Sequence, residues 1–253
     1  MIGISKETIQ SIPCLIVSDD QHGGAPLPTV VYLHGFTSAK EHNLPLAYLL
    51  AEKGYRVILP DSKYHGEREY KIANLKRQIS FWDIVMKNVD ELQKIKSALD
   101  DHQLIQGDRF GVAGTSMGGI TTSAALTQYP WIKAAAILMG SPKITTYAQA
   151  LVNHLKELDR LPVKEEKIEK IYEQLKAYDL SMHTDTLMDR PLMFWHGTDD
   201  SIVPFDHSYT FYKEVKEKYK TKRNIHFVKE ENRDHKVSRF AILETVKWFE
   251  KFL

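Results

Sequence analysis

The chain has 253 residues, of which 43% are hydrophobic and 26% are charged, as in an ordinary globular protein. Its 34 lysines and arginines nearly balance 33 aspartates and glutamates, and a net charge of +1 argues against nucleic acid or an anionic membrane as a partner. The single cysteine, Cys14, excludes a disulfide-held scaffold and fits a reducing cytosol. The sequence shows neither a signal-peptide pattern nor an apolar run of about 18 residues. We therefore expect a soluble cytoplasmic protein.

Short apolar, β-branched segments alternate along the chain with longer segments of helical periodicity. The predicted strands are Ile12–Val17, Val30–His34, Tyr55–Pro60, Arg109–Ala113, Ile132–Met139, Pro191–Trp195 and Ile225–Val228. The predicted helices are Leu44–Lys53, Phe81–His102, Gly119–Gln128, Ser208–Tyr219 and Val237–Phe252. Such alternation predicts an α/β fold with a mostly parallel sheet and helices on both faces. Ile2–Gln10 lies too close to Ile12–Val17 for a crossover, which favours an antiparallel hairpin at the edge of the sheet.

The segment 141–190 interrupts this alternation with charged, helix-forming sequence. Within it, Ile168, Ile171 and Leu175 can share one helix face. The segment is either a solvated surface helix packed on the domain or a helical cap over a site at the carboxyl edge of the sheet. We expect one domain, 1–253, with 141–190 as a cap insertion.

A nucleophile motif lies between a predicted strand and a predicted helix. Gly114-Thr115-Ser116-Met117-Gly118-Gly119 contains G-x-S-x-G in the strand–turn–helix context that gives this motif its meaning. A serine at such a sharp turn has a strained backbone, and its neighbours two residues away must lack side chains to avoid clashes. Its hydroxyl would lie at a helix N-terminus, which favours developing negative charge. A glycine-rich turn used only for packing or phosphate binding is the alternative.

A nucleophilic serine needs a base and a carboxylate, and the loops after two later predicted strands supply them. Asp199 and Asp200 follow the strand Pro191–Trp195, and His235 follows the last predicted strand. The order Ser, Asp, His therefore places three catalytic residue types at three strand ends. Spacing alone does not separate the two adjacent aspartates.

Chance agreement is a concern because the chain contains 11 histidines. His34 and His196 each precede a glycine at a strand end, where a structural hydrogen bond is the simplest role. His65 could approach the site from a loop. Only His235 combines the expected order with the expected loop. No H-x-x-x-H or Cys/His cluster indicates a metal site, and we expect none.

A tetrahedral intermediate also needs hydrogen-bond donors for its oxyanion. The amide of Met117, directly after the serine, is one candidate, and the second should come from the loop after an earlier central strand. Gly35 permits an unusual turn in such a loop, and Phe36 offers its N–H there. A plain strand-ending turn is the alternative interpretation of that loop.

Taken together, these motifs resemble the α/β-hydrolase fold over essentially the whole chain. More narrowly, the chain is similar to small bacterial esterases of the dienelactone hydrolase and prolyl oligopeptidase-like branch. The family pattern H-G-x-x-D-x-x-V-P falls on His196 to Pro204 and implies Asp200 as the acid, with Asp199 as the second candidate. Two departures matter: dienelactone hydrolases use cysteine where this chain has Ser116, and the propeller of prolyl oligopeptidases is missing.

The resemblance implies a serine hydrolase that cleaves carboxylic esters of small to medium acyl substrates through an acyl-enzyme intermediate. Ser116, Asp200 and His235 would form the triad, and the amides of Phe36 and Met117 the oxyanion hole. An aminoacyl or short-peptide hydrolase or a thioesterase would use the same residues. A non-catalytic ligand-binding protein on this fold is the further alternative. We expect no cofactor and a small-molecule acyl substrate as the partner, and the sequence leaves the oligomeric state open.

Overall fold

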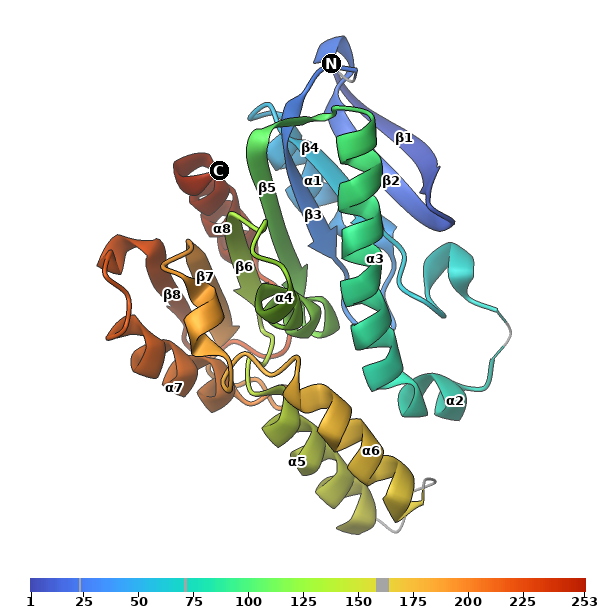
Figure 1. Cartoon of the computed structure of the whole chain (residues 1–253), viewed down its shortest axis with the longest axis vertical. Coiled ribbons are helices and arrows are strands. Elements are labelled where there is room, and N and C mark those ends of the chain that lie inside the picture. Colours follow the sequence, from blue (N-terminus) through green and yellow to red (C-terminus); the bar gives the residue numbers. More distant parts are fainter. Residues whose placement is uncertain (23, 71, 158–163) are drawn as a thin grey trace.

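The computed structural model describes residues 1–22, 24–70, 72–157 and 164–253. It contains one eight-stranded sheet with the order β1-β2-β4-β3-β5-β6-β7-β8 (Figure 1). The strands are β1 (Ile2–Ile9), β2 (Ile12–Asp19), β3 (Leu27–Leu33), β4 (Arg56–Pro60), β5 (Ile105–Thr115), β6 (Ala134–Leu138), β7 (Leu192–Gly197) and β8 (Ile225–Glu230). β1 pairs antiparallel with β2 and β2 with β4, whereas all the other pairs are parallel. The predicted sheet and its antiparallel N-terminal edge are confirmed.

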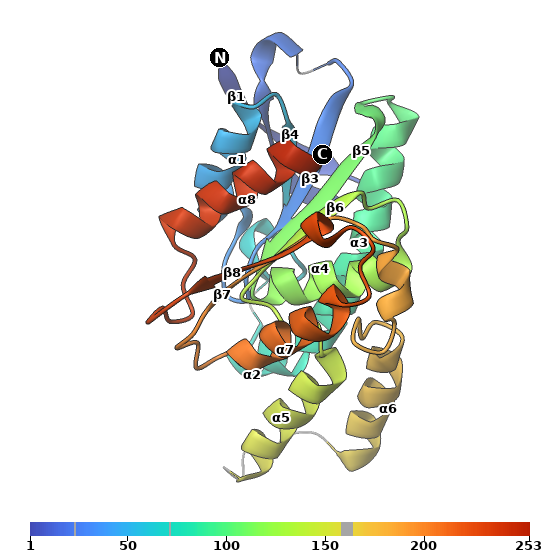
Figure 2. The same ribbon diagram turned by 90° about the vertical axis from the view of Figure 1, so that its left-hand side faces the viewer.

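Helices cover both faces of the sheet. α3 (Phe81–Asp101), α4 (Met117–Gln128) and α7 (Phe205–Lys216) contribute to the core on one face. α1 (Leu44–Ala51) and α8 (Arg239–Phe252) cover the other face, and Figure 2 shows these two side by side. Successive residues of β3 alternate between the two cores, so the strand reads as a continuous apolar run.

Two of the differences from the sequence prediction have identifiable reasons. β5 begins four residues before the predicted strand, because the exposed residues 106–108 hide its start from a pattern based on burial. The six-residue helix α2 (Asn74–Ile79) has no buried residue and therefore no apolar face to reveal it.

The insertion after β6 forms a pair of helices, α5 (Ile144–Glu157) and α6 (Glu165–Lys176), which extend beyond the carboxyl edge of the sheet (Figures 1 and 2). Its base packs on the rest of the fold: Ile144 and Leu175 are fully buried in the same apolar cluster as Met117 of α4. Part of the predicted cap range, 158–163, lies outside the described residues.

Cys14 lies buried on β2, where burial raises the pKa of its thiol to about 12. In the part of the chain that the structure describes, no helix combines the length and the apolar character that a membrane crossing requires.

Candidate active site

The backbone turns sharply at Ser116, between the end of β5 at Thr115 and the start of α4 at Met117. Ser116 has a φ of 53°, in the left-handed region that a non-glycine residue rarely adopts. A Cβ on Gly114 would lie 2.4 Å from the backbone of Gly118. A Cβ on Gly118 would lie 2.0 Å from the carbonyl oxygen of Leu33. Both glycines of the motif therefore allow contacts that any side chain would prevent.

His235 connects the serine to a carboxylate. Its Nε2 lies 2.8 Å from Ser116 Oγ, and its Nδ1 lies 2.7 Å from Asp200 Oδ2. Because a carboxylate only accepts hydrogen bonds, Nδ1 carries the proton and Nε2 is left to accept from the serine hydroxyl. The structure thus brings together three residues that the sequence places 84 and 35 positions apart.

Asp200 is held by four donors. Oδ1 accepts from the amides of Ile202 and Val203, both at 2.9 Å, and Oδ2 accepts from His235 and from His196 Nε2 at 3.0 Å. Burial on its own raises the pKa of Asp200, but hydrogen bonds from the two imidazoles and the Val203 amide outweigh burial and hold that pKa well below its usual range. The carboxylate is therefore charged.

The neighbouring carboxylate takes no part in these contacts. Asp199 is exposed, and its Oδ1 accepts from Thr198 Oγ1 at 2.8 Å. Of the two adjacent aspartates that sequence spacing left unresolved, the structure brings Asp200 to the imidazole.

His196 contacts the site in a way that the sequence analysis did not foresee. This fully buried residue at the end of β7 places Nε2 against two acceptors, Asp200 Oδ2 and Val203 O, so that Nε2 carries a proton. Its Nδ1 lies 2.8 Å from Ser208 Oγ. The structural hydrogen bond expected for His196 is thus made to Asp200. The H-G-x-x-D spacing in the sequence is the pattern that could have indicated this contact.

The two candidate oxyanion donors lie on either side of Ser116. Met117 is the first residue of α4, where backbone N–H groups lack helical partners. On the other side, Gly35 lies against the serine, since a Cβ there would be 3.6 Å from Ser116 Cβ. This contact brings the Phe36 loop next to the hydroxyl.

A series of aromatic rings runs from this loop toward the insertion. The ring of Phe36 lies 5.5 Å from Phe81, Phe81 4.9 Å from Trp82, and Trp82 6.1 Å from Tyr147 of α5. They pack in the apolar cluster that contains Met117. Phe81 and Trp82 therefore pack in the core, in the cluster of the residue that follows Ser116.

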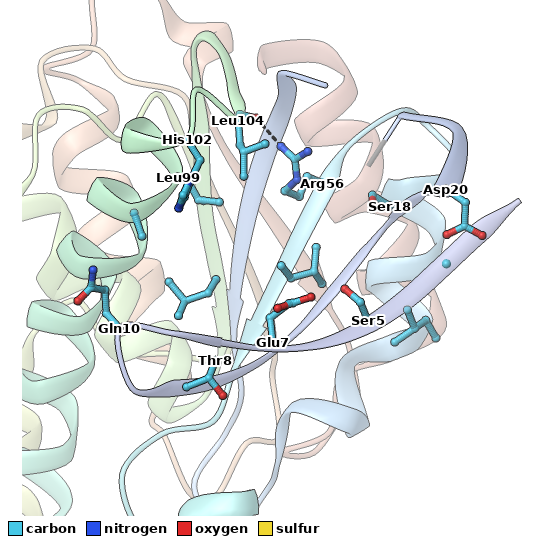
Figure 3. A pocket seen from close by; sticks show the side chains of 15 residues that line it. Ser5, Glu7, Thr8, Gln10, Ser18, Asp20, Arg56, Leu99, His102 and Leu104 are labelled. Atoms are coloured by element: carbon cyan, nitrogen blue, oxygen red, sulfur yellow. Dashed lines mark hydrogen bonds between the residues drawn. The ribbon is translucent and has the colours of Figure 1, made fainter. Parts of the chain in front are cut away.

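A separate hollow of about 720 Å³, between β1, β2 and the end of α3, shares no lining residue with this site (Figure 3). Glu7 of β1, Arg56 of β4 and His102 after α3 contribute to its lining. Within the described residues, no group of three or more His, Cys, Asp or Glu could hold a metal ion.

Comparison with known proteins identifies the family. Residues 44–253 match the prolyl oligopeptidase family. The chain belongs to that family. A relative from Bacillus subtilis (strain 168), named "Putative esterase YitV", is 44% identical over 255 residues, 100% of each chain. Esterase YjfP of Escherichia coli (strain K12) is 32% identical over 208 residues, 82% of this chain and 82% of its own.

A solved structure shows the same fold as this prolyl oligopeptidase family member. TT1662 from Thermus thermophilus superposes with a TM-score of 0.78 at 19% identity and covers 99% of this chain and 98% of its own. The α/β-hydrolase resemblance inferred from the motifs is confirmed.

Proposed function

We propose that the protein is a serine esterase that cleaves carboxylic esters through an acyl-enzyme intermediate. The observation that carries the proposal is the pair of contacts at His235, 2.8 Å to Ser116 Oγ and 2.7 Å to Asp200 Oδ2. They supply a nucleophile, a base and a buried carboxylate in hydrogen-bond reach of one another.

In the first half-reaction, Ser116 Oγ attacks the ester carbonyl carbon while His235 Nε2 takes the hydroxyl proton. Asp200 keeps Nδ1 protonated and stabilises the imidazolium that forms. The amides of Phe36 and Met117 donate to the oxyanion of the tetrahedral intermediate. The intermediate collapses as His235 returns the proton to the leaving alkoxide, which departs as an alcohol.

In the second half-reaction, His235 takes a proton from water, and the resulting hydroxide attacks the acyl-serine carbonyl. A second tetrahedral intermediate collapses, the proton returns to Ser116 Oγ, and the carboxylic acid leaves. No residue beyond the triad and the two amides is needed to balance these steps.

We propose small to medium acyl groups as substrates, and the whole chain, 1–253, as one domain with 141–190 as its cap. Support comes from two relatives named as esterases and from the aromatic rings beside Ser116, which join the loop of Phe36 to α5. The family name favours aminoacyl or short-peptide amides as the second candidate substrates, with thioesters as a third. The single cysteine, the buried Cys14, is compatible with the cytoplasmic location that we propose.

Labelling with a fluorophosphonate probe, followed by peptide mapping, tests the function. Such a probe reacts rapidly only with a serine whose base and oxyanion donors are assembled. We expect stoichiometric labelling at Ser116 and turnover of p-nitrophenyl esters. Folded protein that neither labels nor turns over esters, amides and thioesters would favour the non-catalytic binding protein instead.

Ser116→Ala is the matched control. Because the triad acts as a unit, we expect kcat to fall by about 10⁴–10⁶-fold. A purified Ser116→Ala protein that keeps most of its esterase activity would rule out the proposed nucleophile.

A further inference from the structure

The proposed oxyanion donor, the N–H of Phe36, belongs to the peptide bond between Gly35 and Phe36. The carbonyl group of this peptide is held by two hydrogen bonds. Its carbonyl oxygen, Gly35 O, accepts from His34 Nδ1 at 2.7 Å and from the amide of Ser38 at 3.2 Å. Because a trans peptide is planar, fixing the direction of Gly35 C=O also fixes the opposite direction of the Phe36 N–H. The direction of this N–H therefore depends on the groups that hold Gly35 O, which include the Ser38 amide in the loop that follows.

That loop is strained at its next residue. Thr37 has a φ of 63°, a left-handed conformation that a β-branched residue adopts only when its surroundings enforce it. The amide of Thr37 donates to His65 Nε2 at 3.1 Å. This hydrogen bond comes from another segment of the chain, the loop that follows β4, and fixes the peptide directly after Phe36.

The imidazole of His65 can accept this bond only in one form. Its Nδ1 lies 2.9 Å from Lys63 O, an acceptor, so Nδ1 carries the proton and Nε2 presents a lone pair to Thr37. His65 is 1% exposed, and burial is the main cause that lowers its pKa, against a smaller opposing effect of the Lys63 carbonyl. The edge of the Phe36 ring packs on it at 5.3 Å between centroids.

The two loops hold each other reciprocally. While His65 accepts from Thr37, His34 Nε2 accepts from the amide of Ser62 at 3.0 Å in the opposite direction. A third connection joins the same loops, because Asp61 accepts from the backbone amide and the Nζ of Lys40. His65 is the member of this set that reaches the peptide adjacent to Phe36.

We propose that His65 is a positioning residue for the oxyanion hole, which holds the Phe36–Thr37 segment by accepting from the Thr37 amide. Its ring nitrogens bond to Thr37 and Lys63 rather than to the triad. The inference rests on the proposed esterase function and adds to it a second loop, 61–67, on which transition-state stabilisation depends. A misoriented Phe36 amide would destabilise the tetrahedral intermediate more than the bound substrate, because the oxyanion forms only in the intermediate.

Substitution of His65 by glutamine or by asparagine distinguishes the roles of its two ring nitrogens. The amide of glutamine reaches the position of Nε2 and can accept from Thr37, whereas the shorter asparagine reaches only the position of Nδ1. For His65→Asn we expect kcat on a p-nitrophenyl ester to fall by about 10- to 100-fold with KM within about 2-fold, a loss below that of deleting an oxyanion donor. For His65→Gln we expect kcat within about 3-fold of wild type. Equal kcat in all three proteins, or equal losses in both variants, would overturn the inference.

Histidine ¹⁵N NMR of the wild-type protein gives a measurement that does not depend on the activity of a variant. At pH 7 we expect the His65 ring, assigned by its loss in His65→Gln, to be neutral and protonated at Nδ1. A ring protonated at Nε2 could not accept from Thr37 and would contradict the inference. Wild-type protein without hydrolase activity would overturn the proposed function and this inference together, whereas an active wild type with unaffected His65→Asn would overturn the inference alone.

Discussion

At the scale of single residues, the site depends on a carboxylate whose four hydrogen bonds come from both the backbone and two imidazoles. Asp200 has a side chain that is 0% exposed, so each lost partner would leave an unpaired polar group in a buried position. The pKa of Asp200 is held low, and the group therefore stays charged as the imidazolium forms beside it.

Asp200→Asn tests this role against its neighbour. An asparagine amide facing His235 Nδ1 favours the wrong tautomer, so we expect kcat to fall by about 10³–10⁴-fold. Asp199→Asn alters an exposed carboxylate that contacts only Thr198, and its kcat should stay within about 2-fold of wild type. Steady-state kinetics on one ester decides the matter: a larger loss for Asp199→Asn would reassign the acid.

Among the residues of the proposed site, the sequence could indicate those whose order and loop position are informative. Ser116 lies in a local motif, and Asp200 and His235 follow strand ends in a known order. The sequence indicated only that His65 could approach the site and that His196 could make a structural hydrogen bond, because their roles depend on which atoms they meet. The Thr37 amide lies 28 residues from His65, and no spacing rule indicates which nitrogen of a buried imidazole carries the proton.

At the scale of secondary-structure elements, the start of α4 has to approach β3 closely for Ser116 to reach the carboxyl edge of the sheet. The approach is possible because Gly118 has no side chain opposite Leu33 O. Backbone atoms cannot rotate away as side chains can, so a methyl group here would displace the helix or the strand.

Gly118→Ala should therefore lower the free energy of unfolding by about 1–3 kcal/mol and impair ester hydrolysis, as expected for overpacking at a rigid contact. Urea denaturation measures the change. Gly24→Ala is the matched control, because a Cβ at Gly24 meets nothing within 4 Å. Equal stability of the two variants would show that α4 can shift freely.

The helical pair α5–α6 offers another test at this scale. Leu175 is 0% exposed in the cluster that includes Met117, whereas Leu155 near the end of α5 is 36% exposed. Leu175→Ala should lower the free energy of unfolding by about 2–5 kcal/mol, and Leu155→Ala by much less. Calorimetry that shows a single transition for Leu175→Ala at lower temperature would support one cooperative domain; a separate early transition would contradict it.

Element prediction from sequence succeeded where burial follows a period. The strands of the sheet centre are apolar on both faces, and the last helix has one apolar face, so both patterns are visible in the sequence. The prediction was less accurate at the ends of strands whose residues are exposed, such as residues 106–108 of β5, because exposed positions carry no apolar pattern. It also left open whether 141–190 is a surface helix packed on the domain or a cap over a site, because that depends on tertiary contacts of its buried residues.

At the scale of the whole molecule, neutral imidazoles in the interior make stability depend on pH. Burial lowers the pKa of His34 to about 4, and burial also lowers the pKa of His65. Both groups take up protons more readily in the unfolded chain, where the pKa of histidine is near 6.5. Their contribution to stability is complete above about pH 6.5 and is lost as the pH falls toward 4.

We therefore expect the free energy of unfolding to fall between about pH 6.5 and 4, with roughly 3 kcal/mol of that loss from His34, whose pKa shift corresponds to about 1.4 kcal/mol per pH unit. Urea denaturation across this range measures the slope. His34→Gln removes the titrating group and should reduce the slope. An unchanged slope in that variant would show that other groups dominate acid unfolding.

The thiol of Cys14 has a practical consequence. It lies buried on β2, and its raised pKa leaves almost no thiolate at neutral pH, so maleimide reagents will leave the native protein unmodified. A cysteine introduced at an exposed position such as Leu155 would then be the sole reactive thiol. A fluorophore attached there would report, in real time and without further mutagenesis, whether the far end of α5 moves when an ester binds.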